Sequence, residues 1–351
     1  MDFETVDEML VEANKRGASD LHITVGIPAK IRVDGLLVSL GEKRLMPPDT
    51  ERLITAIMDD FVTERVKKDG EADFSYAIPG VGRYRVNVFK QRGSYAAAIR
   101  LVSMEIPTPE MLGLPESVID LTNKKRGLII VTGPTGSGKS TTLASLIDVI
   151  NATRNGHVIT LEEPIEFLHR HDKCIVNQRE IGIDAVSYSS ALRAALREDP
   201  DVILVGEMRD LDTISTAITA AETGHLVFST LHTIGAASTI DRIVDVFPPH
   251  QQEQIRVQLA SVLESVISQL LLPKEGGGRV AAFEVMHTNP AIKNLMRENK
   301  THQIDTIIQT SRKAGMITME DALVELYKAG KISMENALEY ATDPVSIKRK
   351  L

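Results

Sequence analysis

An eight-residue segment rich in glycine has the residue types that bind a phosphate chain. It reads GPTGSGKS, from Gly133 to Ser140, between the apolar run GLIIVT and a helical pattern. In such a loop the backbone N–H groups point at phosphate oxygens, and the next helix directs its positive N-terminus at them. Lys139 then reaches the β- and γ-phosphates, while Ser140 ligates magnesium. The segment predicts a site for ATP and Mg²⁺ made by Gly133, Pro134, Thr135, Gly136, Ser137, Gly138, Lys139, Ser140 and Thr141.

Hydrolysis also needs carboxylates, one for the metal and one to orient the attacking water. The segment DVILVGEMRD supplies an apolar strand followed by Glu207, which we expect to act on magnesium through water or on the nucleophile. LEEPIEF follows the apolar strand HVITL, and Pro164 ends that strand. Glu162, Glu163 and Glu166 should therefore lie near the carboxyl edge, where open α/β sheets bind ligands. Spacing alone does not choose which of the three polarises the water.

Two histidines flank the apolar strand HLVFST. His232 follows it and so should lie at the carboxyl edge, near the γ-phosphate. His225 precedes the strand. Taken alone, a histidine is more often structural than catalytic, so neither is assigned a role from its position only.

The elements that must position these residues change character along the chain. The first hundred residues combine an amphipathic helix with short strands that alternate apolar and polar residues, as in ADFSYAI, RYRVNVF and SYAAAIRLV, which is typical of a small α+β domain. From Gly127, the fully apolar strands GLIIVT, HVITL, DVILV and HLVFST alternate with helices, which predicts a buried parallel sheet and an α/β core.

Between these regions, prolines at positions 107, 109 and 115 and a glycine at 113 interrupt regular pairing. We therefore predict an N-terminal domain over residues 1–102, a connecting segment over 103–126 and an ATPase domain over 127–351. Within the last domain, the stretch PPHQQEQIRVQLASVLESVISQLLL is predicted to be one long helix, and short helices hold most of the last sixty residues.

Composition excludes several classes of protein. The formal net charge of -8 opposes a duplex nucleic-acid footprint, which requires clustered Lys and Arg. Cys174 is the single cysteine, so no internal disulfide or zinc thiolate cluster is available, and a reducing cytoplasmic location fits. No apolar run approaches the roughly 20 residues that span a bilayer. Membrane association is expected to be peripheral.

The motifs together resemble those of a known family. GPTGSGKST, ITLEEPIEF, ALREDPDVILVGEMRD and TAAETGHLVFSTLHT occur in the order found in the PilT family of type IV pilus retraction ATPases. The resemblance extends to SDLHITVGIPAKIRVDG, RYRVNVFKQRG, STIDRIVDVFP and GGGRVAAFEVMHTNPAIKNLMREN, and so covers nearly the whole chain. Two departures are visible: glutamate at 163 where many relatives have aspartate, and Lys293 where many have arginine.

The resemblance implies roles that spacing could not assign. Glu166 matches the glutamate taken as catalytic, Glu207 takes the metal and water-positioning role, and His225 and His232 become γ-phosphate sensors. The architecture implied is a homo-hexameric ring with a PAS-like N-terminal domain and a RecA-like motor domain. Arginines of such an N-terminal domain complete the ATP site.

Strand RYRVNVF places Arg83 and Arg85 on one face, and Arg100 lies in the next strand. These three are the candidates for that contribution, with exposed sheet-face charges as the alternative. The partners implied are the inner-membrane pilus platform protein and, through it, pilin, with the ring at the cytoplasmic face of the inner membrane. In the family the late segment PAIKNLMRE is associated with retraction, although its pattern alone is that of a surface helix.

Four alternatives remain at this point. An accessory retraction ATPase would share the nucleotide motifs. Pilus extension and type II secretion relatives usually carry a four-cysteine zinc insertion, which one cysteine cannot build. A nucleic-acid-translocating RecA-like motor would need a basic channel and aromatic stacking positions, which the acidic balance and absence of tryptophan oppose. A non-hydrolysing sensor is opposed by the presence of both Glu166 and Glu207.

Overall fold

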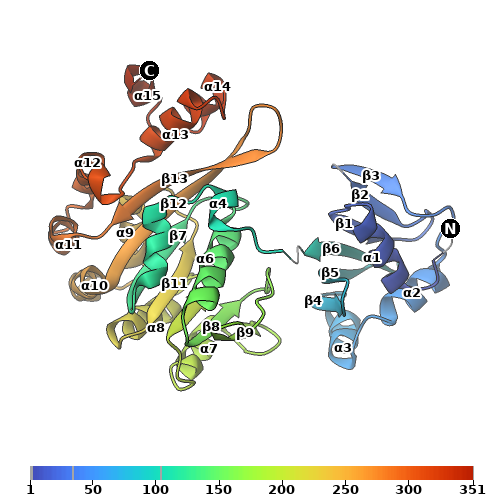
Figure 1. Ribbon diagram of the computed structural model, residues 1–351. Helices are drawn as coiled ribbons and strands as arrows, with labels where there is room; N and C mark the ends of the chain where they lie inside the picture. Colours follow the sequence, from blue (N-terminus) through green and yellow to red (C-terminus); the bar gives the residue numbers. More distant parts are fainter. Residues whose placement is uncertain (1–2, 34, 103–104, 351) are drawn as a thin grey trace. The chain divides into compact units, whose positions relative to one another are not determined.

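The computed structural model describes residues 3–33, 35–102 and 105–350 (Figure 1). The chain divides into two compact units, Met1–Glu105 and Ile106–Leu351, and each is described by itself. A seven-stranded sheet forms the centre of the second unit, and a six-stranded sheet forms the centre of the first.

The first unit is an antiparallel sheet with helices packed on one face. The strands run in the order β3-β2-β1-β6-β5-β4. Its elements are α1 (Val6–Lys15), β1 (Asp20–Ile23), β2 (Lys30–Val33), β3 (Leu36–Ser39), α2 (Pro47–Thr55), α3 (Asp60–Asp69), β4 (Glu71–Ile78), β5 (Gly82–Gln91) and β6 (Ser94–Val102).

Local sequence explains these elements. A capping box starts α1: the hydroxyl of Thr5 accepts from the N–H of Glu8, and the carboxylate of Glu8 accepts from the N–H of Thr5. Along β5, Tyr84, Val86 and Val88 are buried in the core of this unit, which leaves alternate residues on the opposite face of the sheet. The alternation predicted from sequence is confirmed along β5 and the first half of β4, whereas β6 buries the adjacent Ala96 and Ala97.

The second unit contains a mostly parallel sheet in the order β13-β12-β7-β11-β10-β8-β9, in which only β13 is antiparallel to its neighbour. Its strands are β7 (Gly127–Thr132), β8 (His157–Glu162), β9 (Ile175–Glu180), β10 (Val202–Val205), β11 (Leu226–Leu231), β12 (Leu263–Pro273) and β13 (Arg279–His287). The four apolar strands predicted from sequence are confirmed as β7, β8, β10 and β11.

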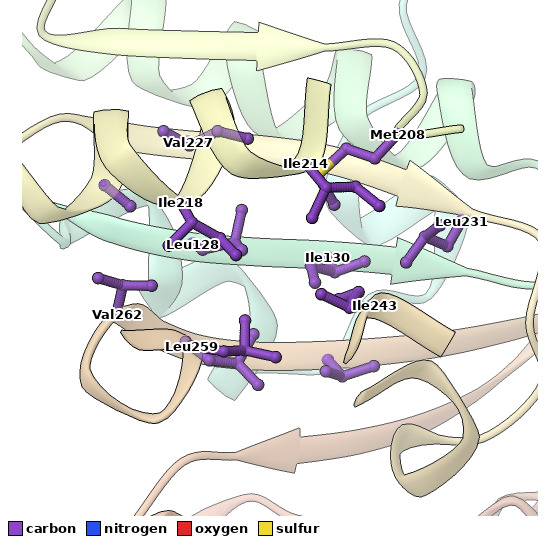
Figure 2. Packing of buried hydrophobic residues seen from close by; sticks show 14 of the residues in the cluster. Leu128, Ile130, Met208, Ile214, Ile218, Val227, Leu231, Ile243, Leu259 and Val262 are labelled. Carbon is purple, nitrogen blue, oxygen red and sulfur yellow. The ribbon is translucent and has the colours of Figure 1, made fainter. Parts of the chain in front are cut away.

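Helices cover both faces of this sheet. The helical elements of this unit are α4 (Pro109–Leu112), α5 (Glu116–Ile119), η1 (Asp120–Asn123), α6 (Lys139–Thr153), α7 (Tyr188–Ala195), α8 (Leu211–Glu222), α9 (Ala236–Asp245), α10 (Pro249–Val262), α11 (Pro290–Arg297), η2 (Thr301–Gln303), α12 (Ile304–Thr310), η3 (Arg312–Ala314), α13 (Met319–Lys328), α14 (Met334–Glu339) and α15 (Pro344–Lys350). Residues on α8, α9 and α10 pack against β7 and β11 on one face, as Figure 2 shows for Leu128, Ile218 and Leu259. Helix α6 packs on the other face. The expected α/β architecture is therefore present.

The predicted long helix is wrong in its second half. Helix α10 ends at Val262, and residues 263–273 form β12, which lies between β7 and β13. Val266 packs in the core on one face of the sheet and Ile267 in the core on the other. A strand buried on both faces has no polar alternation, so its apolar run cannot be told from a buried helix by periodicity.

The predicted connecting segment, residues 103–126, also needs correction. Residues 103 and 104 lie outside the described residues, and the second unit begins at Ile106. Residues 109–123 form α4, α5 and η1, and Leu114, Val118 and Leu121 are buried with α6 and β7. The prolines begin short helices here, as Pro109 does at the first turn of α4, instead of keeping the chain extended.

Candidate functional site

The glycine-rich loop lies between the carboxyl end of β7 and the N-terminus of α6. Gly133 has a φ of 144° and Gly138 a φ of 88°, values that favour glycine. A β-carbon on Gly133 would lie 2.2 Å from the carbonyl oxygen of Gln269, so a larger residue does not fit there. The loop is thus fixed both by its backbone conformation and by the strand beside it.

Gln269, on β12, binds both the glycine-rich loop and the helix that follows it. Its Nε2 donates to the carbonyl oxygen of Ser137 at 2.7 Å, and its Oε1 accepts from the hydroxyl of Thr142 at 2.8 Å. The side chain is buried, so both bonds are shielded from water. Sequence reasoning missed Gln269 because it placed this residue in a helix. A polar residue inside an otherwise apolar run was the available signal.

Lys139 is buried at the first position of α6. Its Nζ donates to the carbonyl oxygens of Gly133 at 2.9 Å and Pro134 at 3.1 Å, and lies 3.4 Å from Nδ1 of His232. Burial lowers the pKa of Lys139 and outweighs the opposite effect of the carboxylates of Glu207 and Glu166. Both carboxylates predicted to serve the site therefore act electrostatically on the lysine.

Glu207, just past the end of β10, contacts the side chains of His232 and Arg209. Its Oε1 lies 3.1 Å from Nε2 of His232 and its Oε2 lies 2.8 Å from the guanidinium of Arg209. Since the ammonium of Lys139 can only donate, the Nδ1 of His232 accepts and its Nε2–H donates to Glu207. Burial raises the pKa of Glu207, but the contacts with Arg209 and His232 outweigh it and the pKa falls below its ordinary value. Glu207 is thus ionised at neutral pH.

The acidic segment at the end of β8 places its three glutamates differently. Glu162 accepts hydrogen bonds from the hydroxyl of Thr160 at 2.6 Å and from Nε2 of Gln178 at 3.2 Å. Burial nonetheless raises the pKa of Glu162. The side chains of Glu163 and Glu166 are exposed and line the same cavity, and of these two it is Glu166 whose charge acts on Lys139.

A cavity of about 550 Å³ lies at this edge of the sheet. It is lined by six of the nine predicted loop residues, namely Thr135, Gly136, Gly138, Lys139, Ser140 and Thr141. Glu166, Glu207 and His232 line it too. Gly133, Pro134 and Ser137 do not line it, although the first two bind Lys139 through their carbonyl groups. Arg209, Tyr188 and Arg279 also line the cavity. Arg209 and Arg279 lie within the segments DVILVGEMRD and GGGRVAAFEV, but none of the three was assigned a role from the sequence.

The structure does not bring His225 to this cavity, which corrects its predicted role as a sensor. Its Nδ1 lies 2.9 Å from the carbonyl oxygen of Ala220, and its own carbonyl accepts from Gly127 at the start of β7. His225 therefore lies at the opposite edge of the sheet from His232, separated by the six residues of β11, or about 20 Å. Within this chain His225 contacts the end of α8 and the start of β7 and does not line the cavity.

The candidate arginines of the first unit lie on neighbouring strands. Arg85 of β5 is exposed and pairs in register with Arg100 of β6, whose Nε lies 3.0 Å from the carboxylate of Asp20. Arg83 is half-buried and donates to the hydroxyl of Ser75 at 3.0 Å. Arg85 and Arg100 are thus both exposed, and Arg83 is the least accessible of the three.

The fold and the loop together define a P-loop nucleotide-binding protein of the RecA-like class. The chain matches the family described as "Type II/IV secretion system protein" over residues 3–339. It is 50% identical to the "Type IV pilus retractation ATPase PilT" of Pseudomonas aeruginosa over 97% of this chain and 98% of that protein. It is 46% identical to a "Twitching motility protein" of Neisseria gonorrhoeae, over 90% of this chain and 85% of that protein.

A solved structure agrees. The crystal structure of the pilus retraction motor PilT with bound ADP superposes with a TM-score of 0.93 at 53% identity, covering 98% of this chain and 99% of that one. The chain therefore belongs to the type II/IV secretion system protein family and, within it, to the PilT family that its motifs resemble. The RecA-like motor domain with a smaller PAS-like N-terminal domain is the architecture it shares with that structure.

Removing the support under the loop should weaken nucleotide binding. We expect Gln269→Ala to raise the Kd for ATP about 30-fold, because two buried hydrogen bonds of about 1 kcal/mol each no longer hold the loop and the start of α6 in their binding conformation. Isothermal titration calorimetry measures this directly. The matched control is Gln254→Ala, at an exposed position on α10, which should bind like the wild type. Unchanged affinity in the Gln269 variant would show that the loop does not depend on β12.

Proposed function

We propose that this protein is an ATPase motor that powers retraction of type IV pili, and so pilin disassembly and twitching motility. One observation carries the proposal: the glycine-rich loop, Lys139, Glu166, Glu207 and His232 converge on one cavity at the carboxyl edge of the sheet. That set has the parts required for phosphoryl transfer to water. The similarity to a pilus retraction motor over nearly the whole chain supports the assignment of the mechanical task.

Each residue has a separate role in this proposal. The backbone N–H groups of the loop and the N-terminus of α6 hold the phosphates, and Lys139 neutralises charge on the transferring group. Glu166 orients the attacking water and accepts its proton. His232, which contacts both Lys139 and Glu207, senses the γ-phosphate.

Magnesium fits the residues present. This ion keeps several waters and takes one or two carboxylates together with substrate phosphates, so it does not need a cage of protein ligands. No group of three or more ligating side chains that could hold a metal occurs in the described part of the chain. Ser140 would bind the ion directly and Glu207 through water, and the ion would neutralise charge on the β- and γ-phosphates.

The motor would work as a homo-hexamer in which Arg83, Arg85 or Arg100 of an N-terminal domain completes an ATP site. Arginine suits this role because its guanidinium binds phosphate oxygens in a bidentate manner. The ring would act at the cytoplasmic face of the inner membrane on the pilus platform protein and, through it, on pilin. Among the described residues no helix has the length and apolar character to cross a membrane.

Two substitutions should separate binding from chemistry. Lys139→Ala should weaken ATP binding, because it removes the charge that faces the phosphates. Glu166→Gln should bind ATP nearly as tightly as the wild type but lower kcat by about 100-fold or more, the usual effect of losing a general base. Nucleotide titration and steady-state phosphate release measure the two quantities. Normal turnover by the Glu166 variant would contradict its assignment.

The direction of the motor is tested in cells that lack this protein. A retraction motor predicts surplus surface pili that extend and do not withdraw, together with loss of twitching. Counting surface pili by electron microscopy gives the answer. Loss of pili would instead indicate an extension ATPase, and normal retraction would indicate an accessory role beside a principal motor. ATPase activity alone does not distinguish these possibilities, because all of them share the nucleotide site.

A further inference from the structure

A second glutamate, far from the nucleotide motifs, lies buried where two helices begin. Glu284 is on β13, and its side chain is nearly inaccessible to solvent. Its Oε1 accepts from the N–H of Ala236, the first residue of α9, at 2.9 Å. Its Oε2 accepts from the N–H of Met319, the first residue of α13, at 3.4 Å. One carboxylate therefore binds free N–H groups at the starts of two ten-residue helices.

Ionised Glu284 is costly for folding. In the part of the chain that the structure describes it has no ion-pair partner, and the charged groups that face it are Asp305 of α12 and Glu320 of α13, both acidic. Burial, together with these two carboxylates, raises the pKa of Glu284 to about 7, against the donated N–H bonds that lower it. A buried charge in this setting reduces stability. The benefit of this carboxylate to the protein therefore lies in the segments that it positions and not in folding stability.

The helix that Glu284 holds begins at the end of a short loop that starts after β11 with His232. At the end of that loop the N–H of Gly235 donates to the hydroxyl of Ser268 on β12 at 3.0 Å, and the next N–H, of Ala236, donates to Glu284 on β13. Two adjacent strands thus anchor two successive N–H groups. His232 lies three residues before the first anchor and contacts both Lys139 and Glu207.

We propose that Glu284 is a positioning residue for hydrolysis: its carboxylate anchors the loop that carries His232 and ties that loop to the C-terminal helices through α13. This inference rests on the proposed ATPase function. Only the ionised carboxylate offers two full-strength acceptor oxygens, one for each helix, because protonation turns one oxygen into a donor. Turnover should therefore depend on ionised Glu284 even though folding does not favour it.

The pH dependences of turnover and stability then have opposite signs. The pKa of Glu284 is raised from 4.5 to about 7 on folding, so the native state binds the proton more tightly than the unfolded chain. Stability from this group is consequently present at low pH and is lost as pH rises through that interval. Turnover that needs the ionised form rises as pH increases through about 7.

The experiment measures ATP hydrolysis by the full-length protein between pH 6 and 8.5 for the wild type and Glu284→Gln. The amide keeps the shape of the side chain but offers one acceptor and no charge. At pH 8 we expect kcat of the variant to fall about tenfold with KM nearly unchanged, since the loop contacts catalytic groups. The ratio of wild-type to variant kcat should approach one at pH 6. The melting temperature of the variant at pH 8 should equal or exceed that of the wild type.

Two further variants make the result decisive. Glu275→Gln, which removes an exposed carboxylate in the β12–β13 hairpin, should behave like the wild type. Ser268→Ala removes the other anchor of the loop and should lower kcat while keeping the pH dependence. Equal kcat for wild type and Glu284→Gln at pH 8 would overturn the inference, as would a loss of turnover matched by a lower melting temperature. A wild-type protein without turnover would instead contradict the proposed function itself.

Discussion

The nucleotide site depends on one buried cation. Lys139 lies inside the loop that it serves, and burial of its ammonium carries a free-energy cost that lowers its pKa. Two loop carbonyls and the nearby carboxylates of Glu166 and Glu207 offset this cost. The same arrangement connects Lys139 to His232 and Glu207, so the groups proposed to act on phosphate, metal and water are electrostatically coupled to one another. Such preorganised charge is what catalysis of phosphoryl transfer requires.

The coupling reaches elements that are distant in the sequence. Gln269 of β12 donates a hydrogen bond to the glycine-rich loop, and Arg209 forms an ion pair with Glu207. Glu284 of β13 fixes the helix that follows His232. Strands β12 and β13 come last in the chain, but β12 pairs with β7 and β13 pairs with β12, so the C-terminal part of the chain lies next to the strand that leads into the phosphate loop. Because Glu284 binds the first N–H groups of both α9 and α13, it connects the C-terminal helices to the loop that carries His232.

The features that could be predicted from the sequence are those that depend on a few adjacent residues. The glycine loop, the apolar parallel strands and the carboxylates after β8 and β10 each follow from a few adjacent residues, and the structure brings Glu166, Glu207 and His232 together at one edge. The features that could not be predicted depend on tertiary contacts between distant parts of the chain. Periodicity could not distinguish β12 from a helix, which hid Gln269, and the packing of residues 109–123 against α6 was not visible in their prolines. His225 was grouped with His232 by resemblance, but the length of β11 separates them.

If the proposed function is correct, ATP hydrolysis at this cavity powers the withdrawal of pili. The most direct measurement follows single fluorescently labelled pili in living cells whose only copy of this protein carries Glu166→Gln. We expect pili of these cells to extend normally and then remain extended, while cells with the wild-type protein withdraw them. Withdrawal at the wild-type rate by cells with the variant would contradict the account, because retraction would then be powered without water activation at this site.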